Sequence, residues 1–253
     1  MNSRCYERES VPYKAFDGII DSLSRHLNKM KTEEASLLLP RHIGDLARLF
    51  PVLQRVQIVA DEVKRYRPPS DFQESRRRAI QSLKELLSAM ADRQNVVLTI
   101  DDLQWGDRDS ARLLQELFYT EDAPAVLLIA TYRSNERERS SCLRQLLDSE
   151  TRSEQSTELI TEIALSELTE EDARQLARSL LSEHQQNDET INQIAAEAGG
   201  SPYFIRELIR HTESLGGQFT TLDEVIVKRV HKLNEDLRRV LELIAISGQP
   251  LTI

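Results

Sequence analysis

Two adjacent carboxylates, Asp101 and Asp102, directly follow a run of mostly apolar residues at positions 96–100. A run of this kind predicts a strand buried on both faces, as in a parallel sheet. In open α/β sheets the ligand binds at the carboxyl ends of the strands, where this pair would lie. One acid can hold Mg²⁺ through its water shell, and the other can orient or deprotonate a water molecule. The pattern therefore predicts the acidic half of a nucleotide-hydrolysing site.

The residues after the acidic pair strengthen this interpretation. Trp105 is the single tryptophan of the chain, and together with Asp107 it extends the pair into a more specific motif. The simpler alternative is that two acids merely end a strand in a turn. The phosphate-binding half, a P-loop with the signature Gly-x-x-x-x-Gly-Lys-Ser/Thr, does not occur in the sequence, because none of the 8 glycines precedes a lysine. The chain thus carries a Walker B pattern without a Walker A.

Two further groups of residues are weaker candidates. Thr131 and Arg133 follow a second apolar run at 125–130, where an arginine could reach a γ-phosphate as a bidentate donor. Taken alone, Arg133 is better explained as a surface arginine of a loop; beside a Walker B strand, the phosphate role is favoured. Gly200 and Pro202 could lay a proline ring against an adenine, although a helix end followed by a proline-initiated helix is sufficient to explain them.

The elements that must position these residues alternate between helix and strand. Helical spacing of apolar residues predicts a helix over 15–30, shorter helices within 32–65 and a long helix just before the acidic strand. Asp107 is a suitable N-cap for a helix between the two apolar runs, so the two strands should be parallel and close neighbours through a right-handed crossover. The segment 158–165 predicts a third strand.

The remainder of the chain predicts helices only. Thr169 and Thr221 each stand three residues before an acidic residue, which is the pattern of a capped helix start, and Asn234 precedes a further apolar helix. A helix-rich second domain is therefore expected to begin near residue 166.

Composition limits the class of protein further. With 40% hydrophobic residues and a net charge of −9, the chain resembles a soluble protein for which nucleic acid is an unlikely partner. No stretch approaches the ~20 apolar residues that cross a bilayer, and no signal peptide is evident, so we expect no membrane association and a cytoplasmic location. Cys5 and Cys142 lie far apart, which predicts neither a metal cluster nor a disulfide framework.

Taken together, these segments resemble the STAND branch of the AAA+ ATPases, a signal-transducing group with an origin-recognition-like nucleotide domain. The segment 97–107 resembles the Walker B motif of that group, and 128–133 resembles its sensor-1 strand. The segment 165–173 is similar to the phrase that leads into the helical lid, and 198–204 to the Gly-x-Pro lid motif. Residues 222–250 resemble the start of the winged-helix module that follows the lid.

The resemblance implies an α/β fold: the partial parallel sheet of a P-loop NTPase with flanking helices, followed by an all-α lid. The implied division is an incomplete AAA+ core over 1–165, a helical lid over 166–220 and the beginning of a winged-helix module over 221–253. The implied function is that of an ATP-dependent regulatory switch in a larger regulator such as a kinase, cyclase or transcriptional regulator. Its partners would be effector and sensor domains of the same polypeptide.

By the same resemblance, the cofactors would be ATP or ADP with Mg²⁺. Asp101 would serve Mg²⁺ through water, and Asp102 would act on the attacking water, so these two are the implied catalytic residues. Arg133 would contact the γ-phosphate and Pro202 the adenine. The implied nucleotide-binding residues are Thr131, Arg133, Gly200 and Pro202.

The sequence departs from the pattern of that group at both ends. The P-loop would lie upstream of residue 1 and the winged helix is cut, so we expect an internal fragment or a truncated reading frame. Without the amides and lysine of a P-loop, a triphosphate loses most of its donors, so we expect no ATP turnover and at best weak nucleotide binding by this chain alone. A missing strand would leave an unpaired sheet edge, which favours self-association.

Two other functions remain open at this point. A non-catalytic AAA+-like adaptor, a protein-interaction scaffold that has lost ATP binding, would carry the same motifs. An origin-binding initiator is less favoured, because the net charge of −9 opposes contact with a phosphate backbone.

Overall fold

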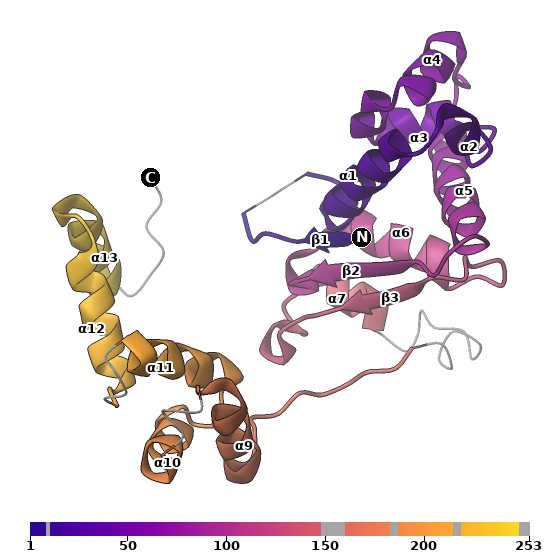
Figure 1. Cartoon of the computed structure of the whole chain (residues 1–253). Coiled ribbons are helices and arrows are strands. Elements are labelled where there is room, and N and C mark those ends of the chain that lie inside the picture. The colour runs from indigo at the N-terminus through magenta and orange to yellow at the C-terminus, as the bar shows by residue number, and fades with distance from the viewer. Residues whose placement is uncertain (9–10, 148–159, 183–186, 215–218, 248–253) are drawn as a thin grey trace. The chain divides into compact units, whose positions relative to one another are not determined.

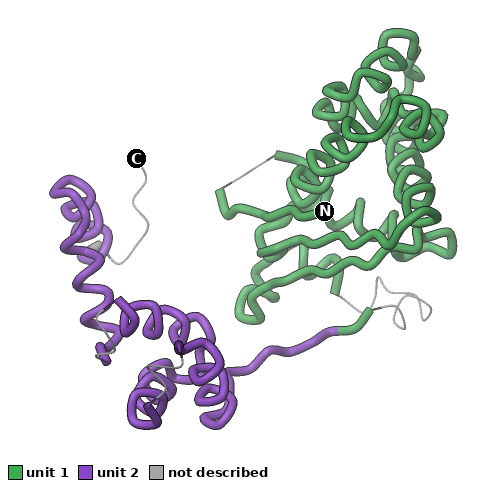
Figure 2. Tube along the Cα trace, viewed as in Figure 1, with its two compact units in different colours: residues 1–161 green, residues 162–253 purple. Residues whose placement is uncertain are grey.

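The structure is a computed structural model that describes residues 1–8, 11–147, 160–182, 187–214 and 219–247. The chain forms two compact units, residues 1–161 and 162–253, which are described separately below (Figure 2).

Unit 1 is built on a sheet of three parallel strands in the order β1-β2-β3 (Figure 1). The strands are β1 (Asn2–Arg4), β2 (Val97–Asp101) and β3 (Leu127–Ala130). β2 lies in the centre, with Arg4 paired to Asp101 on one side and Ala130 paired to Ile100 on the other. This arrangement confirms that the two apolar runs form parallel neighbours, and with its helices it confirms the α/β class with a partial parallel sheet.

Helices surround this sheet, as the periodicity of apolar residues predicts. The helix expected over 15–30 is α1, and the long helix before β2 is α5. The α-helices of unit 1 are α1 (Lys14–Lys29), α2 (Thr32–Ser36), α3 (Ile43–Leu49), α4 (Gln57–Arg65), α5 (Phe72–Ala91), α6 (Arg108–Phe118) and α7 (Ser141–Leu147). Single 3₁₀ turns are η1 (Pro51–Arg55), η2 (Leu103–Trp105) and η3 (Ser134–Glu136).

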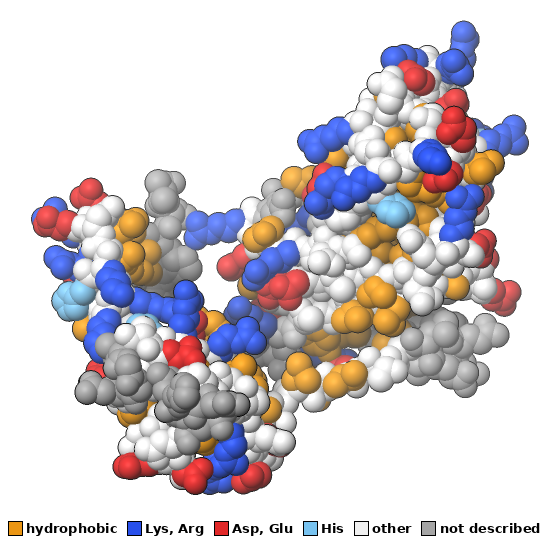
Figure 3. Space-filling model, in the orientation of Figure 1, with side chains coloured by type: hydrophobic (Ala, Val, Ile, Leu, Met, Phe, Trp, Pro, Cys, Tyr) orange, Lys and Arg blue, Asp and Glu red, His pale blue; other side chains and the backbone are white. Residues whose placement is uncertain are grey.

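The two faces of the sheet differ in cover. Leu98 and Ile100 point into the main core, where both are fully buried among residues of α1, α5 and α6. On the opposite face, Val97, Leu127 and Ile129 are 40%, 57% and 46% exposed, and Figure 3 shows hydrophobic side chains over this part of the sheet. Parallel sheets are normally covered on both faces. Among the described residues, this face carries no such cover.

The carboxylate of Asp107 accepts hydrogen bonds from the first residues of two helices, α1 and α6. Asp107 is the N-cap of α6, where it accepts a hydrogen bond from the backbone N–H of Ser110 at 2.8 Å, as predicted. It also accepts from the backbone N–H groups of Tyr13 and Lys14, at 3.2 and 3.1 Å, where α1 begins. Burial opposes ionisation of Asp107, but these hydrogen bonds, led by those from Ser110, outweigh it and hold the pKa below its usual range.

Unit 2 is helical throughout its described secondary structure. The predicted N-caps are confirmed, since Thr169, Thr221 and Asn234 each accept a hydrogen bond from a backbone N–H three residues on. A small core forms between α9, α10 and α11 and takes in Val225 of α12. The helices are α9 (Glu170–Leu180), α10 (Asp188–Glu197), α11 (Pro202–Ser214), α12 (Leu222–Lys232) and α13 (Glu235–Ser247).

The prediction of a third strand over 158–165 is wrong for residues 160–165, which form no helix or strand; 158 and 159 lie outside the described residues. Ile163 and Leu165 are 76% and 93% exposed. Alternating apolar residues make a strand only where a neighbouring strand supplies hydrogen bonds, and no strand among the described residues pairs with 160–165. The division of residues 166–253 into lid and winged helix stays a prediction. Within the described part of the chain, no helix has the length and apolarity needed to span a membrane.

Candidate functional site

The acidic pair lies at the carboxyl end of the central strand. Asp101 is the last residue of β2, and its side chain is 55% exposed. The hydroxyl of Thr131 donates a hydrogen bond to its carboxylate. The ladder brings them together, because the backbone N–H of Thr131 donates to the carbonyl of Ile100 at 2.9 Å. Asp101 thus presents its carboxylate oxygens to solvent beside the hydroxyl oxygen of Thr131, which follows the neighbouring strand.

Asp102 is turned away from the strand by its backbone. Its φ of 56° lies in the left-handed region, which aspartate tolerates better than most residues. Two bonds hold this conformation: the N–H of Asp102 donates to the Thr131 hydroxyl at 3.3 Å, and the N–H of Leu103 donates to the Thr131 carbonyl at 2.9 Å. Thr131 therefore fixes both carboxylates relative to each other.

The Asp102 side chain is 17% exposed and is held on both oxygens. Gln104 Nε2 donates to Oδ1 at 2.9 Å, while Arg4 donates to Oδ2 from Nη2 at 2.7 Å and from Nε at 3.1 Å. These hydrogen bonds, that of Gln104 first and that of Arg4 next, hold the pKa of Asp102 below its usual range despite partial burial. In return, the bond to Asp102 raises the pKa of Arg4. A carboxylate held this way stays ionised. It is therefore better suited to orient a hydrogen-bond donor than to act as a base that accepts a proton.

Gln104 also connects the acidic pair to the next loop. Its Oε1 accepts from the backbone N–H of Arg133 at 3.2 Å, so one amide side chain bridges Asp102 and the end of the sensor-like strand. The Arg133 side chain is exposed, and its charge contributes to the lowered pKa of Asp102. The structure therefore brings together Asp101, Asp102, Thr131 and Arg133, and their role toward a nucleotide stays a prediction.

Sequence analysis missed two residues of this cluster, Arg4 and Gln104. Gln104 lies within the motif that was singled out, so its position was a usable signal. Arg4 is 98 residues from Asp102 and only the pairing of β1 with β2 places it there.

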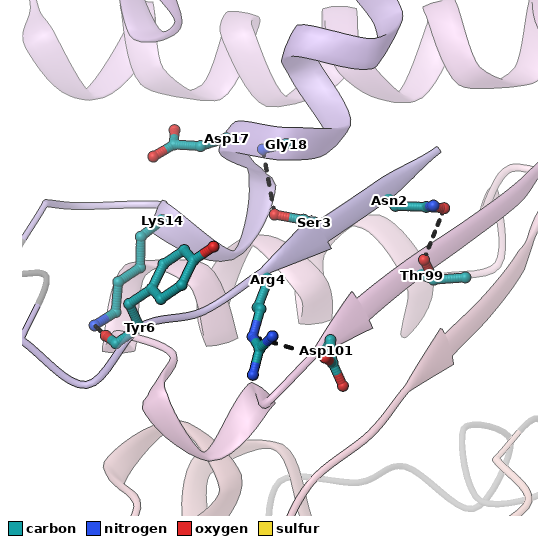
Figure 4. A pocket seen from close by; sticks show the side chains of 9 residues that line it. All are labelled: Asn2, Ser3, Arg4, Tyr6, Lys14, Asp17, Gly18, Thr99 and Asp101. Atoms are coloured by element: carbon teal, nitrogen blue, oxygen red, sulfur yellow. Dashed lines mark hydrogen bonds and ion pairs between the residues drawn. The ribbon is translucent and has the colours of Figure 1, made fainter. Parts of the chain in front are cut away.

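A pocket of about 500 Å³ opens beside the acidic pair (Figure 4). Arg4 and Asp101 face each other at its edge, with 3.8 Å between Nε and Oδ2. On the far side, Lys14 Nζ donates to the carbonyl of Tyr6 at 3.1 Å. The pocket is lined by Asn2, Ser3, Arg4, Tyr6, Lys14, Asp17, Gly18, Thr99 and Asp101.

The cluster fits Mg²⁺ but supplies little for phosphates. Mg²⁺ is usually held by one or two carboxylates, waters and substrate phosphates, and Asp101 with the Thr131 hydroxyl offers such oxygens. The described residues contain no group of three His, Cys, Asp or Glu side chains arranged for an all-protein metal site. Arg133 is the one candidate phosphate donor that the sequence placed here.

Gly200 and Pro202 belong to unit 2. Gly199 and Gly200 have φ of 55° and 75°, and the carbonyl of Gly200 accepts from the N–H of Leu168 at 2.9 Å. Pro202 is the first residue of α11, and the Ser201 hydroxyl accepts from the N–H of Phe204 at 3.4 Å. These contacts explain both residues as a helix end and a helix start, and their role toward adenine stays a prediction.

The fold and the site define a class, that of α/β nucleotide-binding proteins with an acidic pair at the end of a central parallel strand. The family described as "AAA ATPase domain" matches residues 1–129, about half of the chain. The chain therefore belongs to the AAA ATPase domain family, and the acidic pair, Asp101 and Asp102, lies inside the matched segment. Members of this family use ATP or ADP with Mg²⁺. Searches of curated proteins and of solved structures found no match.

Proposed function

We propose that this chain forms the nucleotide-dependent switch of a larger signalling regulator of the STAND type. The observation that carries the proposal is the cluster at the carboxyl end of β2, where Thr131 ties Asp101 to the backbone of Asp102. In this role Asp101 would hold Mg²⁺ through water, and Asp102 would orient the attacking water. The effector and sensor domains of the parent polypeptide are the partners.

The nucleotide state would be transmitted along a short path of hydrogen bonds. Arg133 would contact the γ-phosphate. The backbone N–H of Arg133 donates to Gln104, and Gln104 donates to Asp102, so this path connects Arg133 to the acidic pair. In the same proposal, Gly200 and Pro202 would contact the adenine. This path explains why an ATP-bound and an ADP-bound state would differ.

The lack of a P-loop signature in the sequence determines how tightly we expect this chain to bind nucleotide. Arg133 is the phosphate donor predicted from the sequence, and the sequence lacks the amides and lysine of a P-loop, so we expect at best weak binding of MgATP and no measurable turnover by this chain. The test is amide hydrogen exchange of the whole chain with saturating MgATP, with MgADP and without nucleotide. We expect protection at 99–104 and 131–134 that differs between ATP and ADP.

Matched variants make this test specific. Asp101→Asn should abolish the protection, whereas Asp109→Asn, a nearby acid in the first turn of α6, should leave it unchanged. Absence of any nucleotide effect in the wild-type chain would refute the switch.

A non-catalytic adaptor is the second candidate, and the bonds on Asp102 favour it. Arg4 and Gln104 occupy both of its oxygens, which is the arrangement of a structural carboxylate. If the chain is an adaptor, nucleotide should not slow amide hydrogen exchange at any concentration. The exchange of Asp101→Asn should then equal that of the wild type.

A further inference from the structure

A second pocket of unit 1, of about 380 Å³, lies away from the acidic pair and is rich in arginine. Arg41 approaches it from the turn before α3, Arg65 from the last turn of α4, and Arg67 from the segment that follows. Three arginines thus line one small hollow. Glu62 is the single acid among the lining residues, so the local formal charge is strongly positive.

Two of these arginines have no partner within the described residues. Neither Arg41 nor Arg67 forms an ion pair or a side-chain hydrogen bond there, and Arg65 lies 3.8 Å from Glu62 in an exposed pair. The chain has 42 acidic and 33 basic residues, so acids are plentiful. Arg65 is also explained by its place at a helix C-terminus, where a cation is favoured. That reason does not apply to Arg41 or Arg67.

The floor of this pocket is held rigidly. The Tyr66 ring packs on Gly44 so closely that a Cβ at Gly44 would lie 2.3 Å from Cγ of the ring. The Tyr66 hydroxyl donates to the carboxylate of Asp45, which is 1% exposed and also accepts from the Ser75 hydroxyl. Because Tyr66 stands between Arg65 and Arg67, this anchor fixes the backbone that carries both.

We propose that Arg41, Arg65 and Arg67 form a binding site for a phosphate-bearing small anion of the size of a diphosphate. Arginine forks match phosphate oxygens in pairs, and the three together, offset by Glu62, neutralise about two negative charges. A pocket of this volume lies in the range of small-molecule sites. The site differs from the nucleotide site at Asp101 and needs no Mg²⁺.

The test is calorimetric titration of the whole chain with inorganic pyrophosphate in the presence of a chelator. Without Mg²⁺, the carboxylates of Asp101 and Asp102 repel pyrophosphate. Binding of pyrophosphate under these conditions therefore reports on the arginine pocket. We expect Arg41→Ala and Arg67→Ala each to weaken the affinity about tenfold, and Arg67→Lys to weaken it less. Arg93→Ala, an exposed arginine after α5 without a side-chain partner among the described residues, is the control and should bind like the wild type.

Folding is checked by the thermal midpoint of each variant, and Gly44→Ala, which displaces Tyr66, should also lose affinity. Asp101→Asn should keep the affinity, which separates this site from the proposed switch. The assignment would be overturned if pyrophosphate does not bind, or if the double variant Arg41→Ala/Arg67→Ala binds it as tightly as the wild type. It would also be overturned if the chain binds an oligoglutamate peptide but not pyrophosphate.

Discussion

The guanidinium of Arg4 holds the carboxylate of Asp102 through two hydrogen bonds, at 2.7 and 3.1 Å, across 98 residues of sequence. The pair joins the edge strand β1 to the turn after the central strand. It therefore ties the acidic pair to the sheet on the side opposite to Thr131.

Replacing Arg4 by methionine should raise the pKa of Asp102 toward its ordinary value. The folded-state pKa of Asp102 is lowered, so its ionised form stabilises the fold above the unfolded pKa of about 3.9, and this contribution is lost as the pH falls through the folded pKa. In Arg4→Met the loss of stability on the acid side should be smaller. The measurement is an NMR titration of the Asp102 carboxyl carbon. Arg25→Met, which removes an ion pair with Asp21, should leave that titration unchanged.

Thr131→Val should loosen the acidic pair while keeping the shape of the side chain. The hydroxyl accepts from the N–H of Asp102 and donates to Asp101, so its loss should speed hydrogen exchange at the Asp102 amide. We expect Thr131→Ser, which keeps the hydroxyl, to exchange like the wild type. Equal exchange in all three proteins would contradict a positioning role for Thr131.

Alanine substitutions at Gly199 and Gly200 separate the cost of backbone strain from the cost of steric crowding. Both have positive φ, but a Cβ at Gly200 would lie 2.7 Å from the Leu168 carbonyl, whereas one at Gly199 would meet nothing within 4 Å. Gly199→Ala should cost about 1 kcal/mol from strain alone, and Gly200→Ala should cost more. Denaturant unfolding followed by circular dichroism measures both. A larger effect at Gly199 would show that the contact with Leu168 is unimportant.

The sheet face that no described residue covers should drive self-association. Ile129 is 46% exposed on the edge strand β3, next to Val97 and Leu127. Sedimentation velocity should show oligomers of the wild-type chain that Ile129→Lys reduces. Leu37→Lys, at a position 74% exposed after α2, is the control and should not change the distribution. A monomeric wild-type chain at high concentration would refute this expectation.

Cys142 should be chemically inert in the folded protein. Burial raises the pKa of its thiol to about 12, and only the thiolate is alkylated. At pH 8 its alkylation should therefore be on the order of 1,000-fold slower than in the denatured chain, where the pKa is about 8.5. Peptide-resolved mass spectrometry after iodoacetamide treatment measures this ratio. Comparable rates in the folded and denatured chain would mean that the site around Cys142 opens readily.

Local features of this protein were predictable because their causes are local. The strands β2 and β3 follow from apolar runs, and the helix starts at Asp107, Thr169 and Thr221 follow from side chains that cap backbone N–H groups three residues on. The crossover rule then placed the two strands side by side, and with them Thr131 beside Asp101. Much of the candidate site could be predicted in this way.

The wrong prediction of a third strand has a physical reason. The alternating pattern at 158–165 satisfied the local rule for a strand, but in the described part of the chain no strand pairs with residues 160–165. A strand is stable only with its partner, and the partner lies elsewhere in the sequence.

The sequence by itself determined the α/β class, the acidic pair at a strand end and the lack of a P-loop signature. Only the tertiary structure decided what surrounds that pair. Arg4 reaches Asp102 because β1 pairs with β2. Arg65 and Arg67 lie at the second pocket because Tyr66 between them is anchored to the buried Asp45, and the packing of α3 beside α4 brings Arg41 to the same pocket. Contacts between residues far apart in the chain depend on the packing of whole elements, and no spacing within the sequence encodes them.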